Sequence, residues 1–554
     1  MTRLPVRLPG RGGSACALAA ALAVAIAACS DSTGPTGGAV ADVTLGAAQF
    51  QLYTGNTVPG AFHFPAAGAA GAQYLVVAQF ATPTPDVSSA FNLVGSVTAP
   101  LAAAAAQPRL AAESPAQRFH DNLRRAEARL VASSRSAEGR RPLAAAGAQP
   151  APATITPPVA GTKRTFKVCG NLDCTPPLTN VTATAKIVGA HAALYLDDSL
   201  PAGGFTVSDL QQLAAQFETD LYAIDRNAFG AESDVDSNGV VIILLTPKVN
   251  ALVSKAACTT SFVTGFFYGA DLEPSVRAQY NNGEVFYGFV PDPAGTVSCA
   301  HSVSDVRQLV AVTFIHEFQH MISFNQHALV RNGDVEVLWL NEALSHLAEE
   351  LGGRHYDSLG IGSTASQFYI GDLYNAYQFL ANPSGVAMVT DVGPGDLAQR
   401  GGAWLFVRYL VDRFGAGIPH ALVNTAALGG ANIAAATATG FPTLLGRWAL
   451  AAYTSDLPGF TPPAELRYET WHFRTTFASL HTQDVQDFPV AFPLVPAAAT
   501  GSTVSLAGTL RSGSGSYVVV TQAANAAGFA LAFRPGVASF PASAGAQLAV
   551  VRLR

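Results

Sequence analysis

The clearest helical pattern in the chain runs from residue 302 to residue 321. Its apolar positions recur mostly at spacings of three and four residues: Val306, Leu309, Val310, Phe314 and Met321. Such spacing is typical of a helix that buries one face. Ser302 or Ser304 can cap this helix, and Asp305 lies in its first turn, where a negative charge suits the helix dipole. Residues 339–350 repeat the amphipathic pattern after a loop through residues 325–336, so we expect a second helix that returns beside the first.

Other segments also have helical patterns. Residues 206–209 read Thr-Val-Ser-Asp, a helix-start signature, and the apolar face that follows comprises Leu210, Leu213, Ala214, Phe217, Leu221 and Ile224. Residues 402–411 form an apolar helical segment. Further upstream, Ser114 can cap a helix that carries Pro115 in its first turn. The apolar face of that helix comprises Phe119, Leu123, Ala126 and Leu130.

Strand patterns gather near both ends and in the middle of the chain. Residues 73–80 are β-prone and are flanked by segments that contain Gly, Pro and Thr, where a strand is expected to begin and end. Residues 240–245 read as a buried strand, and residues 284–290 read as a second strand that Pro291 ends. Near the C-terminus, short β-prone pieces are separated by Gly and Ser turns, which is typical of a small sandwich. These pieces include residues 516–521 and 547–551.

Together the patterns predict an α+β protein. A central domain with a small mixed sheet and a long helix is flanked by β-rich regions at its N- and C-terminal sides. Residues 101–161 are rich in Ala, Pro and Arg, and they are either a propeptide or a spacer. The expected boundaries are a signal segment (1–29), a tether (30–45), an N-terminal β-rich region (46–100), a linker with one helix (101–161), a central domain (162–472) and a C-terminal β-sandwich (473–554).

Composition narrows the function classes. Of 554 residues, 49% are hydrophobic and 13% are charged, and the formal net charge is -6 with an isoelectric point near 6.0. This balance, without a long Lys/Arg cluster, gives no reason to expect nucleic acid as a partner. The chain is long enough for several domains, each with its own core.

The first residues have the pattern of an export signal. Three arginines precede a small, apolar stretch from Ser14 to Ala28, which is too short to span a bilayer comfortably. The segment ends Ile26-Ala27-Ala28-Cys29, which resembles the lipobox of bacterial lipoproteins. That resemblance implies cleavage before Cys29 and a lipid on its thiol, so the protein is expected to be exported and anchored to the cell envelope. The alternative is an ordinary signal of a secreted protein.

Four cysteines remain after the signal and the lipid site. An even number of cysteines in an exported chain favours disulfides. Of the three connectivities, we expect the local one, in which Cys169 pairs with Cys174 and Cys258 with Cys299.

A short stretch inside the first helix carries the candidate chemistry. His316 and His320 are four residues apart, so on a helix they share one face, as two imidazole ligands of one zinc ion would. Glu317 lies beside them and can reach a metal-bound water. Glu342, 22 residues after His320 and on the returning helix, can complete a three-ligand site that leaves a position for water. The alternative is a buried structural helix whose histidines form hydrogen bonds with each other and with nearby backbone groups.

Other zinc arrangements can be compared position by position. The longer H-E-x-x-H-x-x-G-x-x-H form would need glycine and histidine where Ser323 and Gln326 stand, so it is excluded. His327 is expected in a loop and not as a ligand. His346 shares the face of Glu342, and as a fourth ligand it would close the site and argue against catalysis.

The sequence HEFQHMISFN followed by WLNEALSHLAEE resembles the hyicolysin family of bacterial zinc metallopeptidases, within the glutamate-zincin group. The segments DVDSNGVVIILLTPKVN and RGGAWLFVRYLVDRFG are similar to that family as well, and the resemblance covers about residues 163–471. It implies a zincin-like fold with His316, His320 and Glu342 as zinc ligands and Glu317 as general base. Where thermolysin-like relatives often have an aspartate, this chain has His346, so Glu349 or Glu350 would have to orient a ligand histidine.

A second metal pattern is weaker. Asp234, Asp236, Asn238 and Gly239 follow the first half of a calcium loop, but Leu245 stands where such a loop needs a bidentate glutamate. The pattern therefore favours an Asx-rich turn over calcium.

The sequence thus predicts an exported zinc endopeptidase that hydrolyses peptide bonds of protein or peptide substrates with a zinc-activated water and Glu317 as base. The strand at residues 284–290 either pairs with an extended substrate or is an ordinary strand of the sheet. Candidates for stabilising the oxyanion are His355, Tyr356, Tyr369 and Tyr374. The alternative from another class is a cell-surface binding protein with a structural or inactive zinc site, whose β-rich ends would be the working regions.

Overall fold

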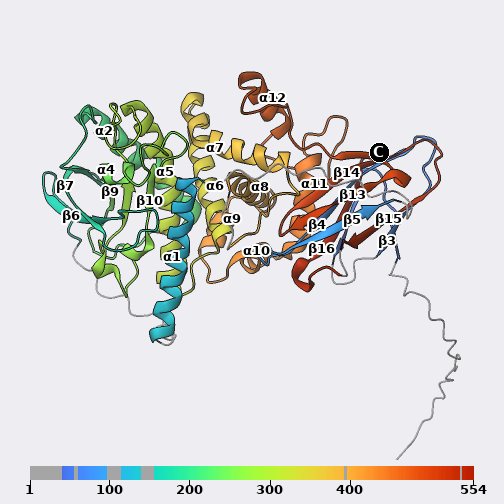
Figure 1. The fold of residues 1–554 in the computed structure, drawn as a ribbon, viewed down its shortest axis with the longest axis horizontal. Coiled ribbons are helices and arrows are strands. Elements are labelled where there is room, and N and C mark those ends of the chain that lie inside the picture. The colour runs from blue at the N-terminus through green and yellow to red at the C-terminus, as the bar shows by residue number, and fades with distance from the viewer. Residues whose placement is uncertain (1–39, 55–59, 96–113, 139–154, 392–395, 537–538) are drawn as a thin grey trace, which may run out of the picture. The chain divides into compact units, whose positions relative to one another are not determined.

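The computed structural model describes residues 40–54, 60–95, 114–138, 155–391, 396–536 and 539–554. These residues form three sheets and a set of helices (Figure 1). This mixed content is compatible with the predicted α+β class. The predicted signal segment 1–29, with the predicted lipid site at Cys29, lies outside the described residues.

The central sheet has six strands in the order β10-β11-β9-β8-β7-β6. Their bounds are β6 (Lys163–Val168), β7 (Thr179–Val188), β8 (Ala192–Asp197), β9 (Val241–Leu245), β10 (Gly265–Phe267) and β11 (Val285–Gly288). Strands β8, β9 and β11 run parallel and the other neighbours antiparallel, so the sheet is mixed. Strand β11 is paired on both sides, so of the two alternatives for residues 284–290 the ordinary sheet strand is confirmed and pairing with substrate is wrong. The two edge strands are β6 and β10, and β10 is a three-residue strand that the apolar pattern did not reveal.

The β-rich ends of the chain pair with each other in two five-stranded sheets. Their orders are β1-β3-β15-β5-β13 and β12-β14-β4-β16-β2. The strands are β1 (Val40–Asp42), β2 (Phe50–Thr54), β3 (Ala61–Phe64), β4 (Ala72–Phe80), β5 (Ser88–Val94), β12 (Ala497–Thr500), β13 (Ser505–Arg511), β14 (Gly515–Gln522), β15 (Phe529–Pro535) and β16 (Ala546–Arg552). For example, β4 pairs antiparallel with both β14 and β16. The prediction of two separate flanking β regions is therefore corrected to one shared pair of sheets.

Two expected segments differ in their local structure. Residues 40–45 were expected in a tether, yet Val40–Asp42 form β1, and Val43 and Leu45 are buried. The region from residue 473 begins with a helix, α12 (Phe473–Gln483), and its strands start only at Ala497. At the first place, the short segment becomes a strand because it pairs with β3.

The helical elements cover the central sheet and extend from it. The α-helices are α1 (Pro115–Glu138), α2 (Val207–Gln216), α3 (Tyr222–Phe229), α4 (Pro247–Asn250), α5 (Val303–Phe324), α6 (Leu338–Ser358), α7 (Gly362–Ala381), α8 (Leu397–Phe414), α9 (Ile418–Val423), α10 (Gly429–Thr437) and α11 (Phe441–Thr454). Two π-helical turns are η1 (Phe217–Leu221) and η4 (Asn325–Val330). Short 3-10 turns are η2 (Gly269–Asp271), η3 (Arg277–Gln279), η5 (Ala464–Leu466), η6 (Gly501–Thr503) and η7 (Ala542–Ala544).

Local capping agrees with the sequence at several helix starts. The Ser302 hydroxyl accepts a hydrogen bond from Asp305 N at 3.1 Å and begins α5. Thr206 and Asp209 form a reciprocal capping box at α2. The predicted loop after α5 is partly wrong, because η4 continues the helix, and His327 within it is fully buried.

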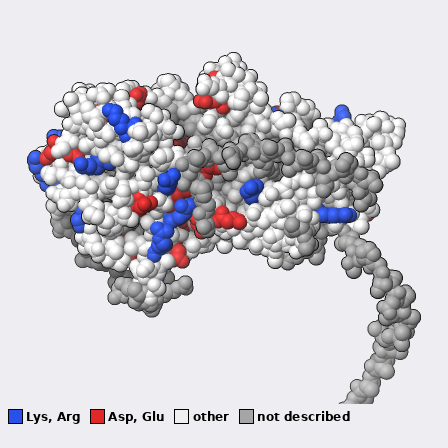
Figure 2. Space-filling view, in the orientation of Figure 1, with Lys and Arg blue, Asp and Glu red and all other residues white. Residues whose placement is uncertain are grey.

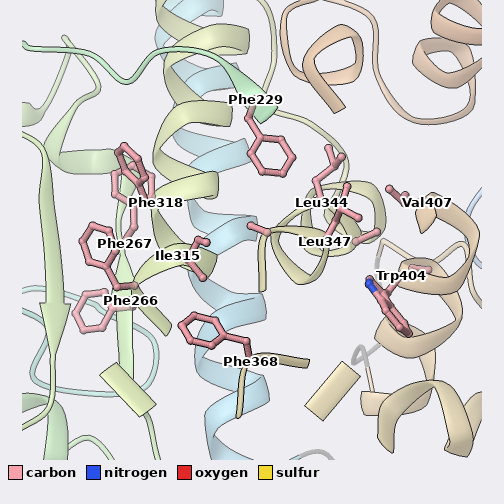
Figure 3. Packing of buried hydrophobic residues seen from close by; sticks show 14 of the residues in the cluster. Phe229, Phe266, Phe267, Ile315, Phe318, Leu344, Leu347, Phe368, Trp404 and Val407 are labelled. Atoms are coloured by element: carbon pink, nitrogen blue, oxygen red, sulfur yellow. The ribbon is translucent and has the colours of Figure 1, made fainter. Parts of the chain in front are cut away.

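Helix α7 approaches α6 and α8 closely because glycines of α6 and α8 lie at these two contacts. A Cβ on Gly401 of α8 would lie 2.1 Å from the carbonyl carbon of Asn375 in α7, and a Cβ on Gly353 of α6 would lie 2.4 Å from the ring of Tyr369. Large apolar side chains fill the remaining space between these helices and the sheet, among them Phe266, Ile315, Phe318, Leu347, Phe368 and Trp404 (Figure 3). This packing fixes the positions of α5 and α6.

Helix α1 is part of this core. Its predicted face is confirmed, since Phe119 and Leu123 are fully buried, and Ser114 caps the helix by accepting a hydrogen bond from Gln117 N at 3.3 Å. Within the predicted linker, this segment is therefore packed and not a free spacer.

The cysteines pair as predicted. Cys169 and Cys174 form one disulfide with Cα atoms 4.7 Å apart, and Cys258 and Cys299 form another at 5.7 Å. Such bonds fit an exported protein. Among the described helices, none combines the length and apolar character needed to cross a membrane. On the face drawn in Figure 2, acidic and basic side chains of the described residues are scattered among uncharged ones.

Candidate metal centre

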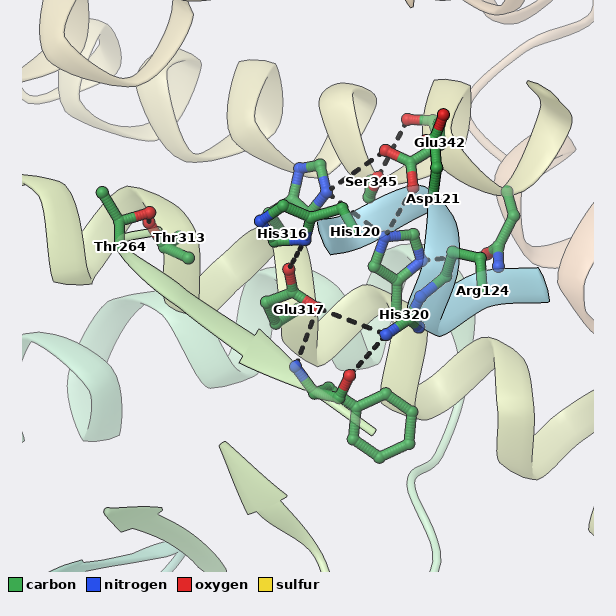
Figure 4. A network of polar contacts seen from close by, with 12 residues as sticks. His120, Asp121, Arg124, Thr264, Thr313, His316, Glu317, His320, Glu342 and Ser345 are labelled. Atoms are coloured by element: carbon green, nitrogen blue, oxygen red, sulfur yellow. Dashed lines mark hydrogen bonds and ion pairs between the residues drawn. The ribbon is translucent and has the colours of Figure 1, made fainter. Parts of the chain in front are cut away.

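Helices α5 and α6 bring three side chains with metal-ligating atoms to one point. His316 and His320 lie one turn apart on α5, and their Nε2 atoms are 3.2 Å from each other. Glu342 reaches them from α6, with Oε2 3.7 Å from His316 Nε2 and Oε1 3.7 Å from His320 Nε2 (Figure 4). The two predicted helices therefore bring the three predicted side chains together, with one possible ligand atom of each within 4.8 Å of those of the other two.

The second nitrogen of each histidine is held by another group. His316 Nδ1 lies 2.6 Å from Glu349 Oε1, and His320 Nδ1 lies 3.1 Å from Asn341 Oδ1. Because both acceptors are oxygens, each Nδ1 carries the hydrogen, and in a neutral ring Nε2 then carries a lone pair. The lone pairs of both histidines therefore face each other and the Glu342 carboxylate.

This arrangement fits a metal ion. Neither oxygen of Glu342 has a hydrogen-bond partner among the described residues, although the side chain is buried. Burial, followed by the charge of Arg124, lowers the pKa of His320 to about 3, so its ring is neutral. Buried lone pairs without donors are costly, and a cation is the group that would satisfy all three. The donor set of two imidazoles and a carboxylate is one that zinc prefers.

Glu317 is fully buried beside this cluster. Its Oε2 accepts a hydrogen bond from Phe267 N at 3.0 Å, and its Oε1 lies 3.3 Å from His120 Nδ1. Burial alone would raise the pKa of Glu317, but the hydrogen bond and charge of His120, with smaller effects of His320 and Arg124, lower it to about 2. The side chain is therefore a carboxylate, able to accept a proton.

His346 is held as a cation. Its Nδ1 lies 2.8 Å from Asp372 Oδ1 and 3.1 Å from Glu349 Oε1. Although burial opposes the charged form, these carboxylates raise the pKa of His346 to about 10. A protonated imidazole offers no lone pair, so this environment disfavours His346 as a fourth ligand.

The two adjacent glutamates that could orient a ligand histidine have different partners. Glu349 bonds His316, as described above. Glu350 instead accepts hydrogen bonds from Trp404 Nε1 at 3.1 Å and Trp471 Nε1 at 2.7 Å, and it pairs with Arg408 at 3.3 Å. Of the two candidates from the sequence, the structure thus brings Glu349 to the cluster.

Several charged residues at the centre were not found from the sequence. Arg400 of α8 lies 3.4 Å from Glu342 Oε2 and 3.1 Å from Asp121 Oδ1 of α1. Figure 4 shows His120, Asp121 and Arg124 of α1 pointing toward the side chains of α5 and α6. Helix α1 precedes α5 by more than 150 residues and carries no ligand spacing, so no local signal could have placed it here.

The predicted oxyanion candidates bond residues outside the cluster. Tyr356 donates to Asp220 Oδ2 at 2.8 Å, and Tyr369 donates to Asp357 Oδ1 at 3.4 Å. His355 lies 3.7 Å from Asp220, and the ring of Tyr374 packs on Phe488. Arg124 and Arg400, by contrast, do reach the centre, where they lie 3.9 Å from Glu317 and 3.4 Å from Glu342.

The calcium-like loop is a separate cluster. Asp234 and Asp236 lie close to Glu284, and their carboxylate oxygens are within 4.8 Å of one another. Asn238 is not part of this set: its Oδ1 accepts from Val240 N at 2.7 Å and its Nδ2 donates to Asp236 Oδ2 at 2.9 Å. The sequence missed Glu284 because it precedes a different strand, β11.

Comparison with known proteins gives one distant similarity to report. No family model matches the chain. Over 170 residues the chain is 27% identical to the neutral metalloprotease ShpI of Staphylococcus hyicus. The similar part covers 30% of this chain and 36% of that protein. This similarity indicates a distant relationship to a metalloprotease and, with it, to enzymes that use a metal.

Proposed function

We propose that the chain is an extracytoplasmic zinc endopeptidase of the hyicolysin type. The observation that carries the proposal is the convergence of the two Nε2 atoms on the Glu342 carboxylate, with the Glu317 carboxylate beside them. Glu342 has no hydrogen-bond partner among the described residues, although Arg400 forms an ion pair with it at 3.4 Å. The distant similarity to a metalloprotease supports the same reading. His316, His320 and Glu342 would hold the zinc ion.

In this proposal each side chain has a defined task. Bound zinc would supply a Lewis acid that polarises a scissile carbonyl and makes water more acidic. Glu317 would accept a proton from the attacking water on a carboxylate oxygen and pass it to the leaving amine. Glu349 and Asn341 would keep His316 and His320 in the tautomers that leave Nε2 free.

The edge of the central sheet offers a place for the substrate backbone. Strand β10 ends next to Glu317, because Phe267 N donates to the Glu317 carboxylate. An extended peptide could add to this edge, which pairs with no other described strand, through main-chain hydrogen bonds that recognise peptides irrespective of most side chains. Protein or peptide substrates are therefore proposed, in line with the activity named for the similar protein.

The location of the enzyme is proposed from the sequence. The lipobox-like Ile26–Cys29 and the preceding apolar stretch favour export and lipid attachment at Cys29, which would anchor the protein to a membrane. The two disulfides are consistent with an oxidising compartment.

One observation favours the alternative function. Side chains of α1 lie against Glu317 and the edge of β10, as they would in a binding protein that retains an inactive zinc site. The two functions differ in whether peptide hydrolysis can be measured at all.

Substitution of the proposed base tests the function. Glu317→Gln should retain zinc, because Glu317 is not a ligand, and should reduce casein hydrolysis by about two to four orders of magnitude. Glu336→Gln is a matched control, since Glu336 is also a buried glutamate but bonds Gly429 N and Asn432 instead. Hydrolysis by the Glu317 variant at the rate of the parent protein would refute the assignment of the base.

A further inference from the structure

Helix α1 lies against the peptide-binding edge that the proposed function requires. The register of β10 and β11 shows which groups are free on that edge: Phe266 pairs with Tyr287, and Phe289 N donates to Thr264 O. Because bonded and non-bonded pairs alternate along an antiparallel ladder, the N–H and C=O of Phe267 point away from β11, to the open side. These are the groups that an added substrate strand would use.

In the structure those groups are taken by side chains. Phe267 O accepts a hydrogen bond from the Arg124 guanidinium, and Phe267 N donates to Glu317. The next free amide along the chain, Gly269 N, donates to Glu127 Oε1 at 2.6 Å. Arg124 and Glu127 of α1 thus supply the donor and the acceptor that an extended peptide backbone would present.

The same helix covers the proposed base. His120 Nδ1 is 3.3 Å from Glu317 Oε1, and Arg124 Nη2 is 3.9 Å from Glu317 Oε2. Arg124 and Glu127 are 4% and 2% exposed and pair with each other at 3.1 Å. Buried charges are retained only where they are paired, so these contacts are made by a fitted surface and not by a loosely lying segment.

We propose that α1 is an autoinhibitory segment that occupies the substrate edge of β10, so that peptides are cleaved only when α1 is displaced or removed. This inference rests on the proposed function, because it names the regulation of the same site. A substrate strand and the Arg124–Glu127 pair cannot bond Phe267 O and Gly269 N at the same time.

We call the contacts of Arg124 with Phe267 O and of Glu127 with Gly269 N the clamp. The test compares the full chain with variants in which this clamp is opened. Arg124→Ala/Glu127→Ala removes both partners of the buried pair together, so neither charge is left alone. We expect casein hydrolysis and the affinity for a fluorescent peptide hydroxamate, measured by anisotropy, each to rise about tenfold or more. Arg129→Ala, an exposed position on the same helix, is the matched control and should leave both unchanged. Arg124→Lys should weaken the same contacts less, because a single ammonium replaces the guanidinium that reaches both Phe267 O and Glu127. This variant keeps the test valid if the double variant does not fold.

The outcomes separate this inference from the proposed function. Equal hydrolysis and equal probe affinity in the full chain and the opened variants would overturn autoinhibition while hydrolysis itself upholds the peptidase. Slower hydrolysis in the opened variants would also overturn it, by making α1 part of the catalytic machinery. Tighter probe binding without hydrolysis in any variant would support the clamp and refute the peptidase.

An independent observation concerns the cluster of Asp234, Asp236 and Glu284. Glu284 immediately precedes β11, and the two aspartates lie in the loop before β9, the parallel neighbour of β11. One carboxylate oxygen of each residue lies within 4.8 Å of one oxygen of each of the other two. Arg164 Nη1, 3.6 Å from Asp236 Oδ2, offsets one of the three negative charges.

The state of Glu284 is what points to a ligand. Its side chain is 1% exposed, and Oε2 has no hydrogen-bond partner among the described residues. Oε1 accepts from Val235 N at 3.0 Å and from the Ser233 hydroxyl. A buried carboxylate oxygen without a partner is costly, and a cation would remove that cost.

We infer that Asp234, Asp236 and Glu284 bind a divalent cation of the calcium type, which joins the starts of β9 and β11. Carboxylate oxygens are hard ligands of the kind that calcium prefers, and the two net negative charges suit a divalent ion. Burial raises the pKa of Glu284 to about 7, which is consistent with a carboxyl that lacks its counter-charge.

Thermal unfolding tests this site. With zinc kept saturating, added calcium should raise the Tm of the full chain by about 2–4 °C or more, relative to protein in a calcium-selective chelator. The shift should vanish in Glu284→Gln and persist in Glu336→Gln, a buried glutamate outside the cluster. No shift in the full chain, or an equal shift in Glu284→Gln, would overturn the inference.

Discussion

Replacing Glu349 should weaken zinc binding without removing a ligand. In the proposed centre, Glu349 Oε1 accepts a hydrogen bond from His316 Nδ1 at 2.6 Å and lies 3.1 Å from His346 Nδ1. The carboxylate therefore fixes the ring of His316, sets its tautomer and makes Nε2 a stronger donor to a metal. None of these effects requires contact with the metal itself.

The expected size follows from which of these effects each substitution removes. Partners of this kind are typically worth a 10- to 100-fold change in metal affinity, or about 1.4–2.7 kcal/mol. The Gln in Glu349→Gln keeps an oxygen that can accept from His316 Nδ1, so only the negative charge is lost, and we expect about a tenfold loss of affinity. Glu349→Ala loses both the charge and the acceptor, and we expect about a hundredfold loss.

The neighbouring glutamate provides the control. Adjacent residues on a helix point in different directions, and Glu350 bonds Trp404, Trp471 and Arg408 instead of His316. Glu350→Gln should lower the free energy of unfolding, because it weakens a buried ion pair, while the zinc affinity stays within about twofold.

Competition against a chromogenic zinc chelator would measure these affinities, with circular dichroism confirming that each variant is folded. Unchanged affinity in both Glu349 variants would refute the role given to this carboxylate. An equal loss in Glu350→Gln would show that the change reflects general destabilisation of α6 and not the hydrogen bond to His316.

Three further predictions concern other residues. Glu342→Ala should reduce the zinc content of purified protein to near zero, because it removes one of three ligands; atomic emission measures this, and unchanged zinc would exclude Glu342 from the site. Asp225 is fully buried, and burial raises its pKa well above 3.8. The folded state therefore holds a proton that the unfolded chain releases above about pH 4. Relative to Asp225→Asn, the unfolding free energy of the parent protein should fall by about 1.4 kcal/mol for each pH unit above that point. Parallel pH profiles of the two proteins in denaturant titrations would contradict this. Cys29→Ser should abolish incorporation of labelled fatty acid and release the protein from membranes, whereas continued labelling would place the lipid elsewhere.

The proximity of His316, His320 and Glu342 could be predicted because it depends on local geometry. The helix repeat alone places His316 and His320 on one face, and a short connection brings the next helix back with Glu342. The disulfide pairing was also local enough to be predicted. These features involve contacts that span a few dozen residues at most.

The rest of the centre depends on contacts that no local pattern encodes. Arg400 and the side chains of α1 reach the site only because α8 and α1 pack on α6, and no local sequence pattern encodes that packing. Strand β10 is three residues long, and its position at the sheet edge depends on pairing with β11, so the wrong strand was expected there. Likewise, β4 pairs with β14 and β16, more than 400 residues later, which apolar alternation cannot reveal.

Several buried carboxyl groups of this protein have oxygens without a hydrogen-bond partner among the described residues. The groups that surround each carboxyl indicate whether a cation or a proton satisfies it. Glu342, Glu284 and Asp225 all have such oxygens, and each loses the solvation that water would give. At Glu342 two imidazole lone pairs face the carboxylate, and at Glu284 two more carboxylates do, so in both places one cation can satisfy every group. At Asp225 no hydrogen-bond partner faces the carboxyl among the described residues, and protonation is what relieves it. The same local defect therefore predicts metal dependence at the first two positions and pH dependence at the third.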